Sequence, residues 1–256
     1  NKKEDKRYIL KFDGVLHLAR IYINGVFVGE HIGGYVSFNF EVTKYLKKGI
    51  NEILVEVDSR EDINTPPFGK TIDYLTFGGI YREVTLLEVS NNYIKNLEIN
   101  SSNLLDNPLI EVFTETDDKV EVLIEVIKNK EVVHSEKGLT NTNIKLSFKP
   151  DLWDLENPNL YHIKAITKDD CYEIRTGFKD VRFEVDGFYL NDEKIKIIGL
   201  NRHQIYPYVG YAMPKSAQVN DAVMLKKIGN AVRTSHYPQS KHFLDACDEL
   251  GLLVFT

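Results

Sequence analysis

Basic and polar side chains follow two short apolar segments near the end of the 256-residue chain. Arg202 and His203 come after the first segment, and Arg233 and His236 come after the second. In parallel α/β folds the loops that follow successive strands converge at one edge of the sheet. Two arginines and two histidines at adjacent strand ends can hold a carboxylate and donate hydrogen bonds to hydroxyl groups. The sequence therefore predicts a polar pocket at this edge.

These residues also have structural interpretations. Arg202 or Arg233 can be an ion-pair partner within the fold, and a histidine at the start of a loop is often hydrogen-bonded to backbone. A metal site on His203 and His236 needs a third ligand, which the sequence does not indicate. No Ser-His-Asp or Cys-His arrangement is supported, and no carboxylate follows these strands where it could pair with a second one, as glycosidic cleavage requires. The bond-breaking residues are therefore not expected within this chain.

The segments that position these residues alternate between strand and helix. Apolar runs predict strands at residues 195–200, 231–234 and 252–255. A first helix begins at Ser216 and ends at a left-handed Gly229, and a second runs from Ser240 to Gly251. The order β-α-β-α-β is the start of a parallel α/β domain, and three strands do not close a barrel by themselves.

The rest of the chain has no helical periodicity before about residue 215 and is predicted to be β-structure. A first series of short strands has the pattern of a β-sandwich, with strands expected at residues 8–12, 20–23, 27–28, 38–42, 52–57 and 84–89. Residues 58–70 form a long loop in this prediction. A second series has the spacing of an immunoglobulin-like sandwich, with strands expected at residues 97–99, 109–114, 120–128, 131–135, 143–148, 161–167 and 172–185. Hairpin turns are indicated at Asn24-Gly25 and Asn129-Lys130.

Composition restricts the partners. A net charge of -6 with interspersed lysines argues against nucleic acid as a binding partner, because binding to phosphates requires a basic surface. No apolar run reaches the roughly 20 residues of a membrane helix. Cys171 and Cys247 have neither metal nor redox spacing and are expected to be reduced. Residues 1–7 lack the apolar core of a signal peptide, so a cytoplasmic location is expected.

Several separate motifs resemble the β-galactosidase and β-glucuronidase family of retaining glycosidases, glycoside hydrolase family two. The most specific is Asn230-Ala231-Val232-Arg233-Thr234-Ser235-His236-Tyr237-Pro238, followed by Phe243-Leu244, Asp248 and Gly251-Leu252-Leu253-Val254-Phe255. Others are Gly199-Leu200-Asn201-Arg202-His203, the segment 152–161 with Trp153, Gly33-Gly34-Tyr35 and Gly78-Gly79-Ile80-Tyr81-Arg82. Gly177-Phe178-Lys179 departs from the family pattern of glycine, aromatic and arginine.

The resemblance implies a multidomain, mostly β architecture. Its parts are a jelly-roll β-sandwich (1–90), an immunoglobulin-like β-sandwich (91–185) and the first β-α-β-α-β part of a (β/α)8 TIM barrel (186–256). In such enzymes two glutamates on later barrel strands act by double displacement. Both are expected beyond Thr256, and the jelly-roll resemblance begins part-way into that domain. The segment by itself is therefore expected to be inactive.

The resemblance also implies site residues. Arg233 would orient the nucleophilic glutamate, and His203 and His236 would donate to sugar hydroxyls. Asp73 matches the acidic residue that galactosidases of this family direct toward the galactose 6-hydroxyl and a sodium ion, which favours a β-galactosidase acting on galactosides or oligosaccharides. Sodium and magnesium are expected in the parent enzyme only, and a homo-oligomer is compatible with the sequence. The alternatives are a β-glucuronidase or β-mannosidase, a non-catalytic carbohydrate-binding module and a purely structural scaffold.

Overall fold

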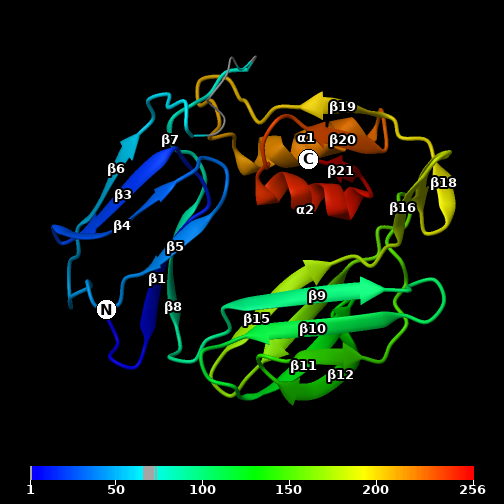
Figure 1. Ribbon diagram of the computed structural model, residues 1–256, viewed down its shortest axis with the longest axis horizontal. Coiled ribbons are helices and arrows are strands. Elements are labelled where there is room, and N and C mark those ends of the chain that lie inside the picture. Colours follow the sequence, from blue (N-terminus) through cyan, green and yellow to red (C-terminus); the bar gives the residue numbers. More distant parts are fainter. Residues whose placement is uncertain (1, 66–71, 73) are drawn as a thin grey trace.

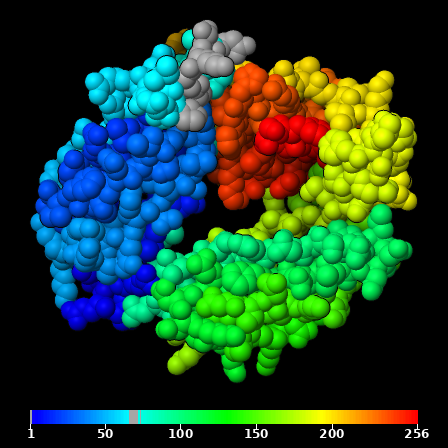
Figure 2. Space-filling view, in the orientation of Figure 1, coloured from blue at the N-terminus to red at the C-terminus, as the bar shows by residue number. Residues whose placement is uncertain are grey.

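The computed structural model describes residues 2–65, 72 and 74–256, which form a mostly β structure with two helices in the described part of the chain. Two β-sandwiches and a smaller α/β part surround a central opening (Figures 1 and 2). This arrangement confirms the predicted fold class. It also brings the α/β part against both sandwiches.

The first sandwich has a jelly-roll character and is built from two three-stranded antiparallel sheets and a short ribbon. One sheet has the order β5 (Phe38–Glu41), β1 (Arg7–Phe12), β8 (Val84–Val89); the other has the order β4 (Val26–Ile32), β3 (Leu18–Ile23), β6 (Ile53–Asp58). The ribbon pairs β2 (Val15–Leu16) with β7 (Gly79–Ile80). Alternate residues of β1 and β3, among them Leu10, Phe12, Ile21 and Ile23, fill the core between the sheets. Asn24 and Gly25 have φ values of 51° and 80°, so the predicted tight hairpin turn is confirmed.

The immunoglobulin-like sandwich packs a three-stranded sheet on a four-stranded one. Its strands are β9 (Asn96–Ser102), β10 (Leu109–Glu115), β11 (Glu121–Lys128), β12 (Glu131–Leu139), β13 (Asn143–Leu146), β14 (Tyr161–Ile166) and β15 (Cys171–Thr176). Asn129 and Lys130 have φ values of 52° and 71°, which confirms the second hairpin. The single strand predicted at residues 172–185 was wrong, because β15 ends at Thr176 and the next strand starts at Val181. Phe178 turns into the core between them, and Gly177 lies so close to the Trp153 ring that a Cβ there would be 2.9 Å from it.

The α/β part begins with an antiparallel hairpin sheet of β16 (Val181–Glu184), β17 (Gly187–Leu190) and β18 (Glu193–Ile195). A parallel sheet follows, in which β19 (Gly199–Arg202), β20 (Ala231–Thr234) and β21 (Leu253–Phe255) alternate with α1 (Lys215–Lys226) and α2 (Lys241–Leu250). Val232 packs against Ala222, Phe243 and Cys247 of the helices. The predicted β-α-β-α-β order is therefore confirmed.

Three details of this part differ from the sequence prediction. Ile195 ends the hairpin sheet, and the first parallel strand starts only at Gly199. The first helix is preceded by Pro214 rather than capped by Ser216; proline is favoured at helix starts because it needs no backbone partner. Gly229 is not left-handed, but a Cβ there would lie 2.3 Å from the Ile198 carbonyl oxygen, so close backbone approach requires the glycine. Gly251, in contrast, ends α2 with φ 68° as predicted.

The immunoglobulin-like sandwich is held to α2 and to the last residue of α1. Trp153 Nε1 donates to the Asp248 carbonyl oxygen (2.8 Å), and Lys226 Nζ donates to the Leu155 carbonyl oxygen (2.7 Å). Arg175 pairs with Glu249 and donates through Nη2 to the Asp245 carbonyl oxygen (2.7 Å). These contacts hold the helix layer against the second sandwich. Neither helix of the described residues has the length and apolarity to cross a membrane.

The two free cysteines differ in access, which gives a first prediction. Cys171 is exposed, whereas Cys247 is buried in the α/β core, where burial raises the pKa of its thiol to about 12. Because the thiolate is the reactive form, a thiol reagent at about pH 8 should label Cys171 in the folded protein and Cys247 only after denaturation. Peptide mapping by mass spectrometry measures both sites. Rapid labelling of Cys247 in the folded protein would contradict the burial.

Candidate functional site

The carboxyl ends of β19 and β20 lie side by side. The two strands pair in parallel, with Asn201 opposite Arg233 and Arg202 opposite Thr234. Side chains alternate between the faces of a strand, and Val232 belongs to the face covered by the helices. Asn201 and Arg233 therefore share the opposite face, which is exposed. The loops that carry His203 and His236 leave from the same edge.

Arg233 and Arg202 have opposite environments. Arg233 is exposed, and its Nη1 donates to Ser235 Oγ at 3.3 Å. Its guanidinium is thus available on the open face of the sheet. The structure places it where a carboxylate could be bound by charge-assisted hydrogen bonds.

Arg202 is a structural arginine, buried between the sheet and the helices. Nε donates to Asp221 Oδ2 (2.9 Å), Nη2 donates to Gln218 Oε1 (2.8 Å), and Nη1 donates to Gln239 Oε1. The guanidinium also lies over the Phe243 ring, 4.0 Å from its centroid. Burial lowers the pKa of Arg202 from its ordinary value, and the Asp221 carboxylate opposes that effect. The ion-pair interpretation therefore applies to this arginine.

His203 and His236 are brought together at the strand ends. Their ring centroids lie 5.4 Å apart with the planes at 82°, an edge-to-face contact. His236 is exposed and follows a cis peptide bond, and His203 is half-buried. The Tyr74 ring contacts both imidazoles, with centroids 5.5 Å from His203 and 5.6 Å from His236. The first sandwich therefore contributes directly to this edge.

A cluster of tyrosines lies behind the histidines and joins the first sandwich to the α/β part. We call Tyr35, Tyr74, Tyr81, Tyr211 and Tyr237 the tyrosine cluster. Tyr35 stacks on Tyr237 with centroids 4.7 Å apart and planes at 9°, and Tyr211 packs on Tyr237 at 5.1 Å. Burial raises the pKa of Tyr81 to about 12 and also raises the pKa values of Tyr35 and Tyr211. These phenols therefore stay neutral.

Hydrogen bonds fix the same junction. Arg82 Nη2 donates to the Pro238 carbonyl oxygen (2.6 Å), and its Nη1 donates to the Tyr35 carbonyl oxygen (3.1 Å). The His242 Nε2 atom lies 2.6 Å from Glu83 Oε1, a contact between α2 and the first sandwich. The loop after β20 is thus attached to the first sandwich immediately beyond His236.

Asp73 lies outside the described residues, so its position relative to the site is not described. Its neighbour Tyr74 is at the site, as the ring contacts above establish. Over residues 2–65, 72 and 74–256, no group of three or more His, Cys, Asp or Glu side chains could hold a metal ion.

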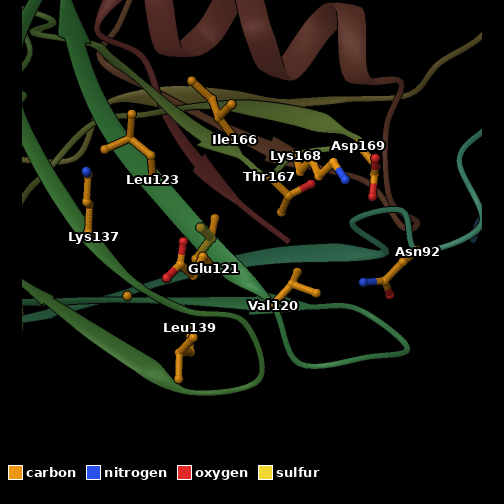
Figure 3. Close-up of a pocket in the computed structure, with 12 residues that line it drawn as sticks. Asn92, Val120, Glu121, Leu123, Lys137, Leu139, Ile166, Thr167, Lys168 and Asp169 are labelled. Carbon is orange, nitrogen blue, oxygen red and sulfur yellow. The ribbon is translucent and has the colours of Figure 1, made fainter.

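A separate hollow of about 790 Å³ lies on the immunoglobulin-like sandwich (Figure 3). It is lined by strands β11 and β12 and by the turn after β14, including Glu121, Leu123, Lys137, Ile166 and Asp169. The described residues that line it include neither aromatic rings nor histidines. Its chemistry does not match the strand-end edge, and it is not part of that site.

Two family descriptions match the chain in the same order as its parts. The sugar binding domain of the glycosyl hydrolases family 2 matches residues 1–90, and the TIM barrel domain of that family matches residues 181–256. Together these matches cover well over half of the chain. The chain belongs to glycosyl hydrolase family 2.

Similar proteins carry two kinds of name. The chain is 44% identical to a β-galactosidase from Thermoanaerobacterium thermosulfurigenes, over 99% of this chain and 39% of that protein. It is 34% identical to a putative β-glucuronidase from Formosa agariphila, over 100% of this chain and 33% of that protein. Among solved structures, an FMN-binding β-glucuronidase from Facaelibacterium prausnitzii L2-6 superposes with a TM-score of 0.92 at 26% identity, over 98% of this chain and 42% of that one. The chain thus spans about two fifths of the β-galactosidase that it matches.

Proposed function

We propose that the chain is part of a β-galactosidase that cleaves terminal β-D-galactosides with retention of configuration. The observation that carries the proposal is the strand-end edge, where exposed Arg233 and the paired imidazoles of His203 and His236 face the open side of a family 2 barrel sheet. Its substrate class is supported by the 44% identity to a protein named β-galactosidase.

In this proposal, glutamates from a later part of the protein perform the bond breaking. One carboxylate attacks the anomeric carbon while the other carboxylic acid protonates the leaving oxygen, and water then hydrolyses the glycosyl intermediate. Arg233 holds the nucleophilic carboxylate through charge-assisted hydrogen bonds. His203 and His236 donate to sugar hydroxyls as charge develops in the transition state.

A β-glucuronidase is the second candidate. It is favoured by the 34% identical relative named putative β-glucuronidase and by the structural similarity to the FMN-binding β-glucuronidase. The two substrates differ at carbon 6, where galactose has a neutral hydroxyl and glucuronic acid a carboxylate. An acidic residue such as Asp73 near this position would favour the hydroxyl and repel the carboxylate.

The decisive experiment compares nitrophenyl β-galactoside, β-glucuronide and β-mannoside as substrates of the full-length gene product. We expect the largest kcat/KM on the galactoside and no turnover by residues 1–256 alone. Preferred turnover of the glucuronide or the mannoside would overturn the galactosidase assignment. Absence of turnover on all three would favour a carbohydrate-binding or structural role.

Asp73 gives a second test of the substrate class. Removing the carboxylate with Asp73→Ala should lower kcat/KM on the galactoside by about 10- to 100-fold, because a hydrogen bond between a binding site and a substrate hydroxyl is worth at least that much. Asp62→Ala is the matched control, since the Asp62 carboxylate bonds only locally to Asn64 among the described contacts. Equal rates for the wild type and Asp73→Ala would remove Asp73 from the site.

Further properties of the parent enzyme follow from the same proposal. Sodium would be held with the help of Asp73, and magnesium would act elsewhere in the full-length protein. A homo-oligomer in the cytoplasm is the proposed working form. Substituting choline for sodium in the galactoside assay tests the ion: an unchanged KM would contradict a sodium site at the sugar.

A further inference from the structure

The Tyr74 ring contacts the imidazoles of both His203 and His236. Tyr74 comes from the segment that precedes β7 of the first sandwich, whereas His203 and His236 follow β19 and β20. The three ring centroids form a nearly equilateral triangle with sides of 5.4, 5.5 and 5.6 Å. We propose that Tyr74 is a positioning residue whose ring fixes the mutual orientation of the His203 and His236 imidazoles. This inference rests on the proposed function, in which those imidazoles donate to the sugar.

The segment carrying Tyr74 is anchored by its neighbours and not only by the Tyr74 ring. Tyr211 OH donates to the Leu75 carbonyl oxygen at 3.0 Å. The Phe77 ring packs on Tyr211 with centroids 5.2 Å apart and fills the space beside Gly210, where a Cβ would lie 2.5 Å from the Phe77 ring. Gly210 has φ 55°, so a glycine suits both the backbone and the contact. Removing the Tyr74 ring should therefore leave its backbone in place.

The described contacts of Tyr74 with the histidines are made by its ring. The Tyr74 ring contacts Tyr237 at 5.7 Å as well as both imidazoles. Its hydroxyl belongs to the tyrosine cluster: after burial and the Tyr211 hydroxyl, it contributes to raising the pKa of Tyr35. A phenylalanine at this position would keep every contact to the histidines. An aliphatic residue would lose them.

His236 lies at a loop start on the open edge of the sheet. It is exposed, so solvent leaves its imidazole room to rotate about its side-chain bonds. Donors that stabilise a transition state must be held close to their productive positions, and a misplacement of about 1 Å can cost about 100-fold in rate. A ring that contacts both imidazoles restricts both at once. Its loss should therefore affect the chemical step more than substrate binding.

The test uses the full-length protein and measures kcat and KM on nitrophenyl galactoside across a range of pH. Tyr74→Phe should stay within about threefold of the wild type, whereas Tyr74→Leu should lower kcat by about 10- to 100-fold with a smaller change in KM. The pH dependence should also move in Tyr74→Leu, because the surroundings of both imidazoles change. Tyr22→Leu is the matched control: it removes the ring that pairs with Phe27 on β4, away from the strand ends, and should leave kcat unchanged.

Three results would overturn the proposal. The first is an unchanged kcat and pH profile in Tyr74→Leu. The second is an equal loss of kcat in Tyr74→Phe and Tyr74→Leu, which would assign the effect to the hydroxyl. The third concerns Tyr74→Met, a flexible apolar replacement to be used if Tyr74→Leu lowers the thermal midpoint: a folded Tyr74→Met variant with wild-type kcat would also overturn the proposal. A wild-type protein without glycosidase activity would refute the proposed function instead, and NMR titration of the two imidazoles in the wild type and Tyr74→Leu would then decide the positioning role.

Discussion

Replacing Arg233 by alanine is expected to lower kcat on a galactoside by about 100- to 1000-fold, the usual cost of removing one donor from a preorganised site. The reason is its position: Arg233 lies on the exposed face of β20, opposite Asn201 of β19. The described side-chain hydrogen bond of Arg233 is a long one, 3.3 Å to Ser235 Oγ, so the stability of the fold depends little on this side chain. The change should therefore appear in kcat and not in the thermal midpoint.

The Arg233→Lys variant separates the contribution of the positive charge from that of the planar guanidinium group. Lysine keeps the positive charge but lacks the planar fork that binds a carboxylate with two parallel hydrogen bonds, so a loss of about tenfold or more is expected. Steady-state kinetics with the full-length protein measures both variants, and thermal unfolding checks their stability. Near-wild-type kcat in Arg233→Ala would refute a role in holding the nucleophile.

Arg202→Ala is expected to produce the opposite result, a large loss of stability. The Asp221 side chain is 37% exposed, so most of the cost comes from buried hydrogen-bonding groups that are left unpaired, at about 1–3 kcal/mol for each group. The side chain of Arg202 is only 5% exposed, and its loss would leave the buried Gln218 and Gln239 oxygens without this donor. The lost contact with the Phe243 ring adds to the effect. Urea unfolding of the wild type and the variant measures the difference in free energy.

Arg182→Ala is the matched control for this experiment. Arg182 also has several carboxylate partners, Asp180, Glu184 and Asp192, but its side chain is 42% exposed. Surface pairs of this kind are worth about 0–1 kcal/mol, so Arg182→Ala should change the free energy of unfolding by no more than that. Similar losses in Arg202→Ala and Arg182→Ala would show that burial is not the source of the effect.

Local signals in the sequence were sufficient where local physics decides the structure. Asn24-Gly25 and Asn129-Lys130 were predicted as tight turns because asparagine and glycine tolerate positive φ, and all four residues adopt it. Gly251 ends α2 for the same reason. Gly229 was misread because a glycine after a helix usually serves as a left-handed cap, whereas here it admits the Ile198 backbone. That contact is tertiary and leaves no local signal.

The residues of the site also divide into those that local signals predict and those that tertiary packing determines. The meeting of His203 with His236 follows from the rule that parallel strands end at one edge. Arg202 and Arg233 look alike in sequence, and only their alternation on neighbouring strands separates a buried structural arginine from an exposed one. The role of Tyr74 could not be predicted, because it depends on how the first sandwich sits against the α/β part. No spacing or periodicity in the sequence encodes that placement.

The members of the tyrosine cluster are synthesised at different times, because they lie far apart in the sequence. Tyr35 and Tyr211, whose hydroxyls lie 3.4 Å apart, are separated by 176 residues. Because ribosomes add about 5–20 residues per second, Tyr35 precedes Tyr211 by about 9 to 35 seconds. During that interval Tyr211 and Tyr237 have not yet been made. The ring contacts that join the first sandwich to the α/β part can therefore form only after the first sandwich has been synthesised.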